Sequence, residues 1–544
     1  MKRILISILG LLAAAQLTSS CAKDYLDEAP KGLYTPQTSL VDSLGFEAGM
    51  AGLMSVVREQ YIYSDNQGVI DMMHVGTDVC ILGNPQGPET SYVRYAELTP
   101  QDAASGWWWG WAYRTINNAN VLIQQAALAP ATVRQGYKDR ITAEAKFYRA
   151  YAYDFLATLY GDVPIITEPL VAPRNDFTRA PLADVNALII SDLTESIPLL
   201  SLISNARFSA PSQSGRINRA AAQQLLAQVY LRTGQPALAE TQLQTIISSG
   251  NFSLITARYG VRANQPGDYY FDMFQVGNQR RNQGNRELIW GIEQQLNVPG
   301  GGTDRYSAQQ RRNWIPGYHN IQGMLVADSL GGRGVGRMRL STWVTYRLFA
   351  ADDIRNSKYN LKRRFYYNDP SRTATFGRRV VVSGTDTLIN ITPYITKWNQ
   401  FDPADVFGFA MVKDLPMMRL GETYLLLAEA QFKQGKLADA AASINVLRRR
   451  AFANYPTRGA VTATDITLNF ILDERARELI GEEQRRLTLI RTGTLIERTT
   501  RLNNTVIPGN YTISGLTPDR VLLPIPQTEI DLNYGLLKQN PGYQ

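Results

Sequence analysis

The chain has 544 residues, of which 44% are hydrophobic and 19% are charged. This composition is typical of a folded globular protein and excludes an intrinsically disordered one; the length exceeds what one core normally organises, so we expect more than one lobe. The formal net charge is +8, but Lys and Arg are spread along the chain, with no basic run beyond Arg448–Arg450. Because no recognition motif accompanies the charge, we expect no nucleic-acid partner.

The N-terminus predicts a signal peptide over residues 1–20. Lys2 and Arg3 precede an apolar stretch over 4–15, and small residues lie directly before Cys21. A cysteine at this point is typical of a lipobox, although Leu17 stands one place further from it than the strict pattern requires; ordinary signal cleavage is the alternative. We expect Cys21 to be lipidated and to hold the protein at a membrane, since two acyl chains anchor a protein stably.

Cys80 is the only other cysteine. By count alone it has Cys21 as a possible disulfide partner, but lipidation of Cys21 removes that partner. We therefore expect Cys80 to be a buried free thiol.

The strongest helical periodicity lies in segments that end at a glycine. Residues 143–159 carry Ala, Phe, Tyr and Leu at three- and four-residue spacing, and Gly161 and Pro164 follow. Two helix pairs repeat this layout further along the chain: 220–231 with 237–248, and 422–432 with 437–452.

The two pairs match each other at a constant offset. Ala227, Gly234, Ala237 and Ala239 correspond to Ala428, Gly435, Ala438 and Ala440. Small residues let paired helices pack closely and the glycine forms the turn, as in tetratricopeptide-like hairpins. We therefore expect a mainly α fold in which scattered helical hairpins build a superhelical scaffold.

Long irregular stretches separate the predicted hairpins. Residues 61–106 and 261–336 are rich in Gly, Asn and polar residues, and long ordered loops on a rigid scaffold commonly carry binding function. Among a few short β-hairpins, we expect one over 379–391. The glycine-rich segment 331–336 lacks the Lys-Ser/Thr ending of a phosphate-binding loop, and we expect a mobile surface loop there.

Several motifs, in order, resemble those of the SusD/RagB family. The most specific are Glu144-Ala145-Lys146-Phe147-Tyr148-Arg149-Ala150-Tyr151 with Tyr160-Gly161-Asp162-Val163-Pro164, Arg419-x-x-Glu422-x-Tyr424-Leu425-x-x-Ala428-Glu429-Ala430, and Glu474-Arg475-x-Arg477-Glu478-Leu479. Leu523-Pro524-Ile525-Pro526 and Gln539-Asn540-Pro541-Gly542-Tyr543 close the pattern. Arg485 and Arg486 stand where the family often has an Arg-Trp pair, at what we expect to be a packing position.

The resemblance implies an outer-membrane lipoprotein at the cell surface that binds nutrients, with an oligosaccharide as the expected ligand and a peptide as the alternative. It also implies a partnership with a SusC-like TonB-dependent β-barrel transporter, to which the ligand is delivered. On this basis we divide the chain after the signal peptide into an N-terminal SusD-like helical region over 21–260 and a C-terminal SusD/RagB-like region with a loop insertion over 261–544.

The chemistry-bearing residues favour a binding protein over an enzyme. Glu474 and Glu478 share one helix face, but Arg475 and Arg477 are interleaved, so we expect a structural ion-pair network and no acid–base pair. The chain has two histidines and none of the H-E-x-x-H, paired-cysteine or G-x-S-x-G motifs. We therefore expect no catalysis, no cofactor and no metal site; a calcium ion held by loop carboxylates and carbonyls is the open alternative, although no EF-hand spacing supports it.

Aromatic residues in and beside the irregular stretches are the candidate ligand contacts. A flat ring matches the apolar face of a sugar, while polar side chains bond its hydroxyl groups. The aromatic candidates are Trp107, Trp108, Tyr61, Tyr63, Tyr269, Tyr270, Trp314 and Tyr318, and the hydrogen-bonding candidates are Arg94 and Asn313. Packing of the loops, or contact with the barrel, is the alternative role for each.

Two other functions stay open at this point. A surface glycosidase on an α-helical scaffold would need two catalytic carboxylates facing one cleft. A purely structural role would stabilise the barrel without any ligand.

Overall fold

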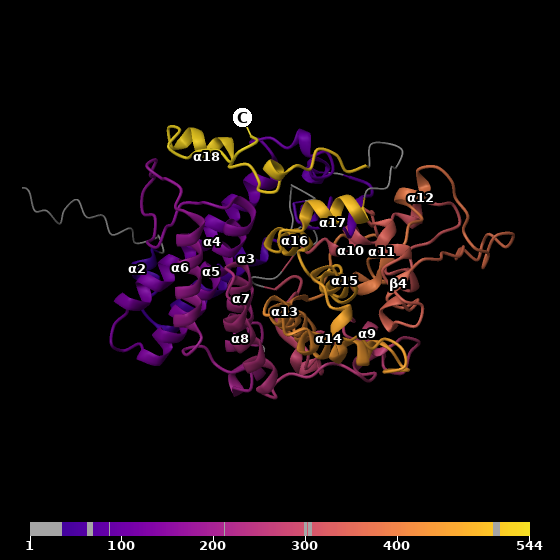
Figure 1. The fold of residues 1–544 in the computed structure, drawn as a ribbon, viewed down its shortest axis with the longest axis horizontal. Helices are drawn as coiled ribbons and strands as arrows, with labels where there is room; N and C mark the ends of the chain where they lie inside the picture. The colour runs from indigo at the N-terminus through magenta and orange to yellow at the C-terminus, as the bar shows by residue number, and fades with distance from the viewer. Residues whose placement is uncertain are drawn as a thin grey trace, which may run out of the picture.

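The computed structural model describes residues 35–62, 69–85, 87–210, 213–298, 302, 307–503 and 512–543. Within them the protein is mainly helical, as predicted (Figure 1). Helices α2 to α8 form one side of the molecule, α13 to α17 lie next to them, and the irregular segments with short helices and strands form the opposite end. Cys21 and Tyr63 lie outside the described residues.

The helices on the N-terminal side are α2 (Pro36–Ser39), α3 (Ser43–Arg58), α4 (Ala103–Leu128), α5 (Gln135–Tyr160), α6 (Leu182–Ser196), α7 (Arg219–Arg232) and α8 (Pro236–Ser248). Those that follow are α9 (Tyr269–Asp272), α10 (Gln310–Trp314), α11 (Thr342–Tyr346), α12 (Asp386–Ile389), α13 (Leu420–Lys433), α14 (Leu437–Ala451), α15 (Leu468–Leu479), α16 (Arg485–Arg491), α17 (Leu495–Leu502) and α18 (Gln527–Leu532).

Both predicted helical hairpins form. Helix α7 packs on α8, and α13 packs on α14. Gly234 and Gly435 each adopt a left-handed φ of +73° at the turn, a conformation that glycine adopts without strain. Glu240 of α8 accepts hydrogen bonds from Gln434 (2.8 Å) and Lys436 (2.7 Å), so the two hairpins stack although about two hundred residues separate them. The tetratricopeptide-like scaffold is confirmed.

The β-structure differs from the expected local hairpins. The strands are β1 (Cys80–Leu82), β2 (Leu288–Ile292), β3 (Met338–Leu340), β4 (Leu361–Lys362), β5 (Tyr394–Ile395) and β6 (Leu415–Arg419). They pair antiparallel as β1 with β3, β2 with β6 and β4 with β5, each across a long stretch of chain. Such pairs clamp distant segments together, which no local turn signal reveals.

The β-hairpin expected over 379–391 is wrong. Arg379 forms a bridge with Tyr366, and Val380 donates its backbone N–H to Phe365 (2.9 Å). The valine-rich segment therefore pairs antiparallel with the chain around Phe365, which precedes it in the sequence. Val380 and Phe365 belong to the same small hydrophobic core. The expected turn instead leads into the short helix α12.

The glycine-rich segment 331–336 is not a surface loop. Its glycines are buried, and an added Cβ would lie 2.1 Å from the carbonyl oxygen of Gln400 at Gly332 and 2.1 Å from that of Ile315 at Gly334. Glycine is needed there because two other stretches of backbone pass in direct contact.

The largest hydrophobic core runs through both regions of the chain. It includes Phe46 of α3, Phe147 of α5, Trp290 of β2, Leu426 of α13 and Tyr543 near the C-terminus. The domain boundary at 260/261 stays a prediction. In the described part of the chain, none of the helices is both long and apolar enough to cross a membrane.

Candidate functional site

Three of the predicted ligand residues meet at one buried segment, 69–74. Trp108 donates its indole N–H to the Val69 carbonyl (3.2 Å), and Asn313 donates to Asp71 (2.6 Å). The ring of Trp314 lies edge-on to His74, with 5.1 Å between centroids. Because all three side chains are at most 2% exposed, this arrangement favours a packing role for them.

Other predicted contacts are also occupied by the protein itself. Tyr269 donates its hydroxyl to the Arg450 carbonyl, Tyr270 to that of Glu478 (2.5 Å) and Tyr318 to that of Gly332 (2.8 Å). Burial raises the pKa of Tyr270 well above its usual value. These hydroxyl groups fix loops to the scaffold.

The remaining described candidates are Trp107, Arg94 and Tyr61. Trp107 is half-buried and stacks on Trp111, with 6.4 Å between centroids. Arg94 pairs with Glu97 at 3.0 Å near the surface. Tyr61 is buried and accepts a hydrogen bond from Gln484 (3.4 Å) beside a central cavity.

The two carboxylates weighed as an acid–base pair are neutralised by arginines. Glu474 bonds to Arg355, Arg448 and Arg477, each at 2.8 Å. Glu478 bonds to Arg355 (3.0 Å), Arg419 (2.6 Å) and Arg450. Both carboxylates are fully buried. Despite burial, which by itself raises a carboxyl pKa, the arginines hold the pKa of Glu474 at about 2. The predicted ion-pair network is confirmed.

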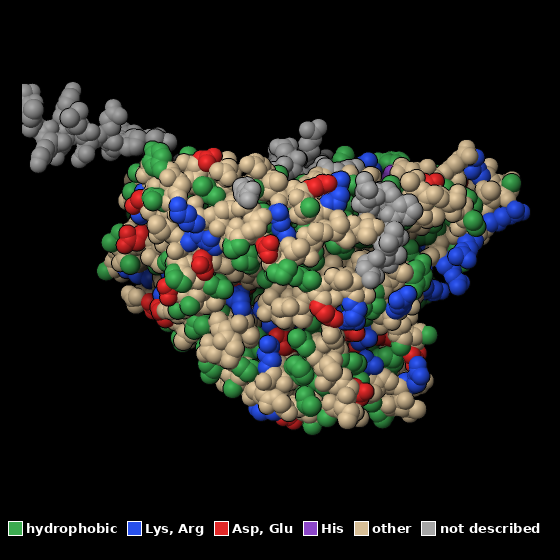
Figure 2. Space-filling view, turned by 45° about the horizontal axis from the view of Figure 1, so that its top comes forward, with side chains coloured by type: hydrophobic (Ala, Val, Ile, Leu, Met, Phe, Trp, Pro, Cys, Tyr) green, Lys and Arg blue, Asp and Glu red, His purple; other side chains and the backbone are tan. Residues whose placement is uncertain are grey.

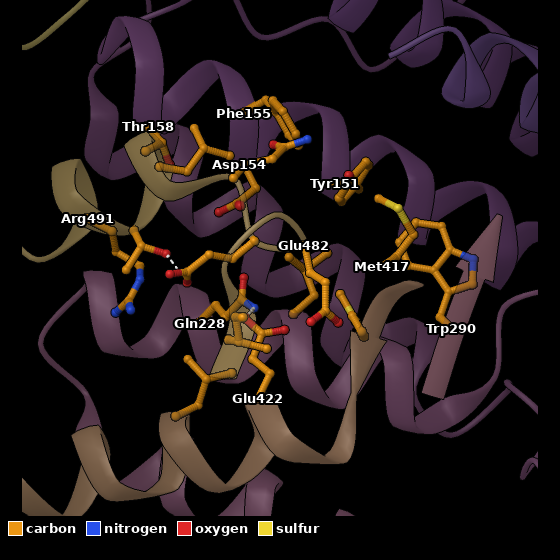
Figure 3. A pocket seen from close by; sticks show the side chains of 18 of the residues that line it. Tyr151, Asp154, Phe155, Thr158, Gln228, Trp290, Met417, Glu422, Glu482 and Arg491 are labelled. Atoms are coloured by element: carbon orange, nitrogen blue, oxygen red, sulfur yellow. Dashed lines mark hydrogen bonds between the residues drawn. The ribbon is translucent and has the colours of Figure 1, made fainter. Parts of the chain in front are cut away.

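A central cavity lies between the N-terminal helices and α13 (Figure 3). Its empty volume, counting the open mouth, is about 870 Å³. Tyr151 and Asp154 of α5, Trp290 of β2, Glu422 of α13 and Arg491 of α16 point into it. These residues join helices that are far apart in the sequence.

The charged groups of this central cavity are already paired. Arg475 bonds to Glu422 (2.9 Å) and Glu483 (2.6 Å), and Arg491 bonds to Glu429 (2.6 Å). The cavity therefore has the character of a structural joint between the hairpins.

A second cleft lies at the surface, near α9 and β4. Its empty volume, counting the open mouth, is about 1570 Å³. Three aromatic rings line it: Phe271 of α9, Tyr359 before β4, and Tyr366 after β4. We call it the aromatic cleft. The rings of Phe271 and Tyr359 lie 6.2 Å apart at 46°, and Tyr366 is 48% exposed.

The carboxylate of Asp268 fixes the positions of two rings that line the aromatic cleft. Asp268 caps α9 by accepting from the backbone N–H of Phe271 (2.8 Å). Its other contacts are the hydroxyl of Ser357 (2.6 Å) and the side-chain amide of Asn360 (3.0 Å). Because Asp268 joins α9 to the turn before β4, it fixes Phe271 beside Tyr359.

The charged residues that line the aromatic cleft are mainly cationic. Arg262 pairs with Asp328 at 3.0 Å across the rim. Burial and nearby Lys358 lower the pKa of Lys362, and burial lowers that of Arg363. In the described ranges, no group of three or more His, Cys, Asp or Glu side chains is arranged to hold a metal ion.

None of the ligand contacts predicted from the sequence lines the aromatic cleft. The signal for it was present in the run Lys358-Tyr359-Asn360-Leu361-Lys362-Arg363-Arg364-Phe365-Tyr366-Tyr367, which mixes cations and aromatics. The statement that no basic run stands out beyond Arg448–Arg450 was therefore wrong. Lys362-Arg363-Arg364 are contiguous, as Arg448–Arg450 are, so this basic run can be read from the sequence alone.

A helical-hairpin scaffold that carries long loops and a loop-built cleft places the protein in the class of tetratricopeptide-like helical scaffolds. Family models agree at both ends of the chain: the model described as "Starch-binding associating with outer membrane" matches residues 24–231, and that described as "SusD family" matches residues 390–543. The chain therefore belongs to the SusD/RagB family.

Individual proteins agree with this assignment. SusD-like protein P25 of Formosa agariphila is 25% identical over 99% of this chain and 100% of its own length. Starch-binding protein SusD of Bacteroides thetaiotaomicron is 36% identical over 24% of this chain and 22% of its own length.

Solved structures show the same fold. Surface glycan-binding protein A from Bacteroides thetaiotaomicron has a TM-score of 0.70 at 18% identity, with 93% of this chain and all of that chain covered. A laminarin-binding SusD-like protein has a TM-score of 0.67 at 23% identity, with 92% and 100% covered.

Proposed function

We propose that this protein is a cell-surface receptor that binds an oligosaccharide in the aromatic cleft. Its family supports this, since relatives carry names such as starch-binding and laminarin-binding, and one structural neighbour is titled as a complex with laminarihexaose. The observation that carries the proposal is the cleft itself, because the exposed ring of Tyr366 and the half-buried rings of Phe271 and Tyr359 lie beside polar side chains, and a sugar needs both for stacking and hydrogen bonding.

Three further parts of the proposal follow from family membership. The protein is anchored through a lipid on Cys21, it sits in the outer membrane at the cell surface, and it delivers its ligand to a SusC-like TonB-dependent barrel. It binds without catalysis, because Glu474 and Glu478 are held by arginines and have no free face toward a substrate.

Isothermal titration calorimetry of the mature protein tests the binding. The panel includes neutral oligosaccharides, oligosaccharides that carry acidic groups, and peptides. We expect saturable binding of at least one oligosaccharide, and we expect Tyr366→Ala to weaken it about two- to tenfold because one stacking ring is lost. Tyr534→Ala removes an exposed tyrosine (80% exposed) outside the cleft and serves as the matched control.

Two outcomes would overturn the proposal. One is the absence of binding to every oligosaccharide, with or without binding of a peptide. The other is release of reducing sugar by the purified protein, which would establish the glycosidase alternative.

A further inference from the structure

The aromatic cleft carries an excess of positive charge on its walls. Five cationic side chains line it, namely Arg262, Lys358, Lys362, Arg363 and Arg364, and Asp328 is the one carboxylate among its lining residues. The net charge of the whole chain is +8, so the cleft concentrates much of that excess in one place. Figure 2 shows Lys and Arg side chains gathered along this end of the molecule.

Most of these cations have no acidic partner. Of the five, only Arg262 forms an ion pair, with Asp328. Lys362 donates to the Ser329 carbonyl (3.1 Å), and Arg363 donates to the Thr345 carbonyl (2.9 Å). Lys358 and Arg364 are exposed, and none of the described carboxylates lies within ion-pair distance of either.

Several buried arginines, by contrast, are paired with acids. Arg355, Arg450 and Arg485 are each about 1% exposed at the side chain, and each bonds to at least two carboxylates. Burial also lowers the pKa of Lys362, and nearby Lys358 lowers it further. Close cations without paired anions create a positive electrostatic potential, which favours the binding of a negatively charged ligand.

We propose that the aromatic cleft selects a glycan with acidic groups, so that sugar rings stack on Phe271, Tyr359 and Tyr366 while the acidic groups pair with the surrounding Lys and Arg. This inference rests on the proposed function and specifies its ligand class. The shared chemistry is an anionic oxygen group on a sugar, which uronic acids supply as carboxylates and sulfated sugars supply as sulfate esters. Both suit the planar guanidinium of arginine, which bonds paired oxygens in a bidentate manner.

The first experiment compares ligands that differ only in charge. A galacturonic acid hexasaccharide and its carboxyl-reduced counterpart form one pair, and a sulfated oligosaccharide and its desulfated counterpart form the other. We expect at least one acidic member to bind more tightly than its neutral counterpart by tenfold or more at low salt. Its affinity falls as NaCl is raised from 20 to 300 mM, since salt screens such pairs.

The second experiment removes charge from the cleft. The double variant Lys358→Gln/Arg364→Gln changes two exposed side chains and leaves the anchored Arg363 and Lys362 intact. We expect it to lower the affinity for the acidic ligand by about fivefold or more, because each exposed ion pair contributes about two- to fivefold. The affinity for a neutral glycan is expected to stay within about twofold. Arg134→Gln/Lys433→Gln removes the same charge at exposed scaffold positions and is expected to change neither.

The outcomes separate this inference from the proposed function. Tight binding of a neutral glycan, with no preference for either acidic member, overturns the inference and leaves the proposed function standing. Equal loss of acidic-ligand affinity in both double variants also overturns it, because the effect would then come from overall charge. Failure of every oligosaccharide to bind overturns the proposed function itself.

Discussion

Many buried arginines in the described part of this protein are compensated by carboxylates, whereas others, such as Arg312, are not. Arg355 bonds to Asp353 (2.7 Å), Glu474 (2.8 Å) and Glu478 (3.0 Å). Arg312 of α10 is also buried, at 6% exposure, but it donates to the side chain of Gln309 (3.0 Å) and stacks on Phe409 at 4.3 Å, with no ion pair to a described carboxylate. Burial, and then its arginine neighbours, lowers the pKa of Arg312 to about 9.

The two arginines should respond oppositely to the same substitution. Arg355→Met leaves buried Asp353 without an ion-pair partner and removes one of the three arginines around Glu474 and Glu478, and it is expected to lower the free energy of unfolding by about 3–5 kcal/mol. Arg312→Met removes a buried cation that has no carboxylate and is expected to be neutral or stabilising. Thermal unfolding followed by tryptophan fluorescence compares them. Equal destabilisation by both variants would contradict this account.

His74 should make the protein sensitive to mild acid. Burial lowers its pKa to about 4, whereas an unfolded histidine titrates near 6.5. Protonation therefore favours the unfolded chain, and stability is expected to fall by up to about 3 kcal/mol as the pH drops from 6.5 to 4. The variant His74→Phe removes this loss, which melting temperatures between pH 7.5 and 4.5 detect.

Other groups also titrate in this pH range, and we expect them to change the stability of the native protein and of His74→Phe by the same amount. The raised pKa of Asp71, about 8 through burial and nearby Glu89, favours the folded state as the pH falls. The lowered pKa of Glu474, about 2, costs stability only at more acidic pH, below about 4.5. The difference between His74→Phe and the native protein isolates His74, and parallel pH profiles would contradict the prediction.

At the scale of elements, stability depends on close backbone contacts as well as on helix pairing. The segment 331–336 passes between the chain around Ile315 and that around Gln400. This contact connects α10 to the segment that follows β5. A side chain inserted there has no space to occupy, since both neighbours are backbone.

Alanine at these glycines should be poorly tolerated. Gly332→Ala and Gly334→Ala would each place a Cβ 2.1 Å from a carbonyl oxygen, and we expect losses of about 1–3 kcal/mol, with more at Gly332 because its φ is +82°. Gly106→Ala in α4 has nothing within 4 Å of the added Cβ and is expected to be neutral or stabilising by about 0.5–1 kcal/mol. Equal melting temperatures for all three variants would refute the packing argument.

At the scale of the whole molecule, the hairpins α7–α8 and α13–α14 lie in the middle, and α9 and β4, which contribute to the aromatic cleft, lie beside α14 and towards the end opposite α2 (Figure 1). Family membership leads us to propose that this body is tethered through its N-terminus and held over a transporter. The tether is a single predicted residue, Cys21, and the chain offers a matched comparison for it.

Metabolic labelling with palmitate tests the anchor. Cys21→Ser is expected to abolish the label and to release the protein from the membrane fraction, because attachment depends on the acyl chains. Cys80→Ser is the control, since Cys80 is a free, fully buried thiol whose pKa burial raises well above its usual value. Labelling that persists in Cys21→Ser, or disappears in Cys80→Ser, would contradict the lipobox interpretation.

The sequence by itself determined the features that depend on local pattern. Apolar and small residues at helical spacing, with Gly234 and Gly435 at the turns, predicted the two hairpins. The alternation of Glu474, Arg475, Arg477 and Glu478 predicted an ion-pair network, because opposite charges at this density on one helix neutralise each other. The ordered motifs predicted the family.

The tertiary structure alone decided which aromatic residues remain accessible. Trp108, Trp314 and Tyr318 are buried although they follow irregular, polar sequence, because distant segments fold over them. The aromatic cleft forms where β4, α9 and the chain around Asp328 and Asn399 meet, and no local pattern encodes that meeting. Exposure is a property of the packed molecule, since the same ring is core or surface according to what the rest of the chain places against it.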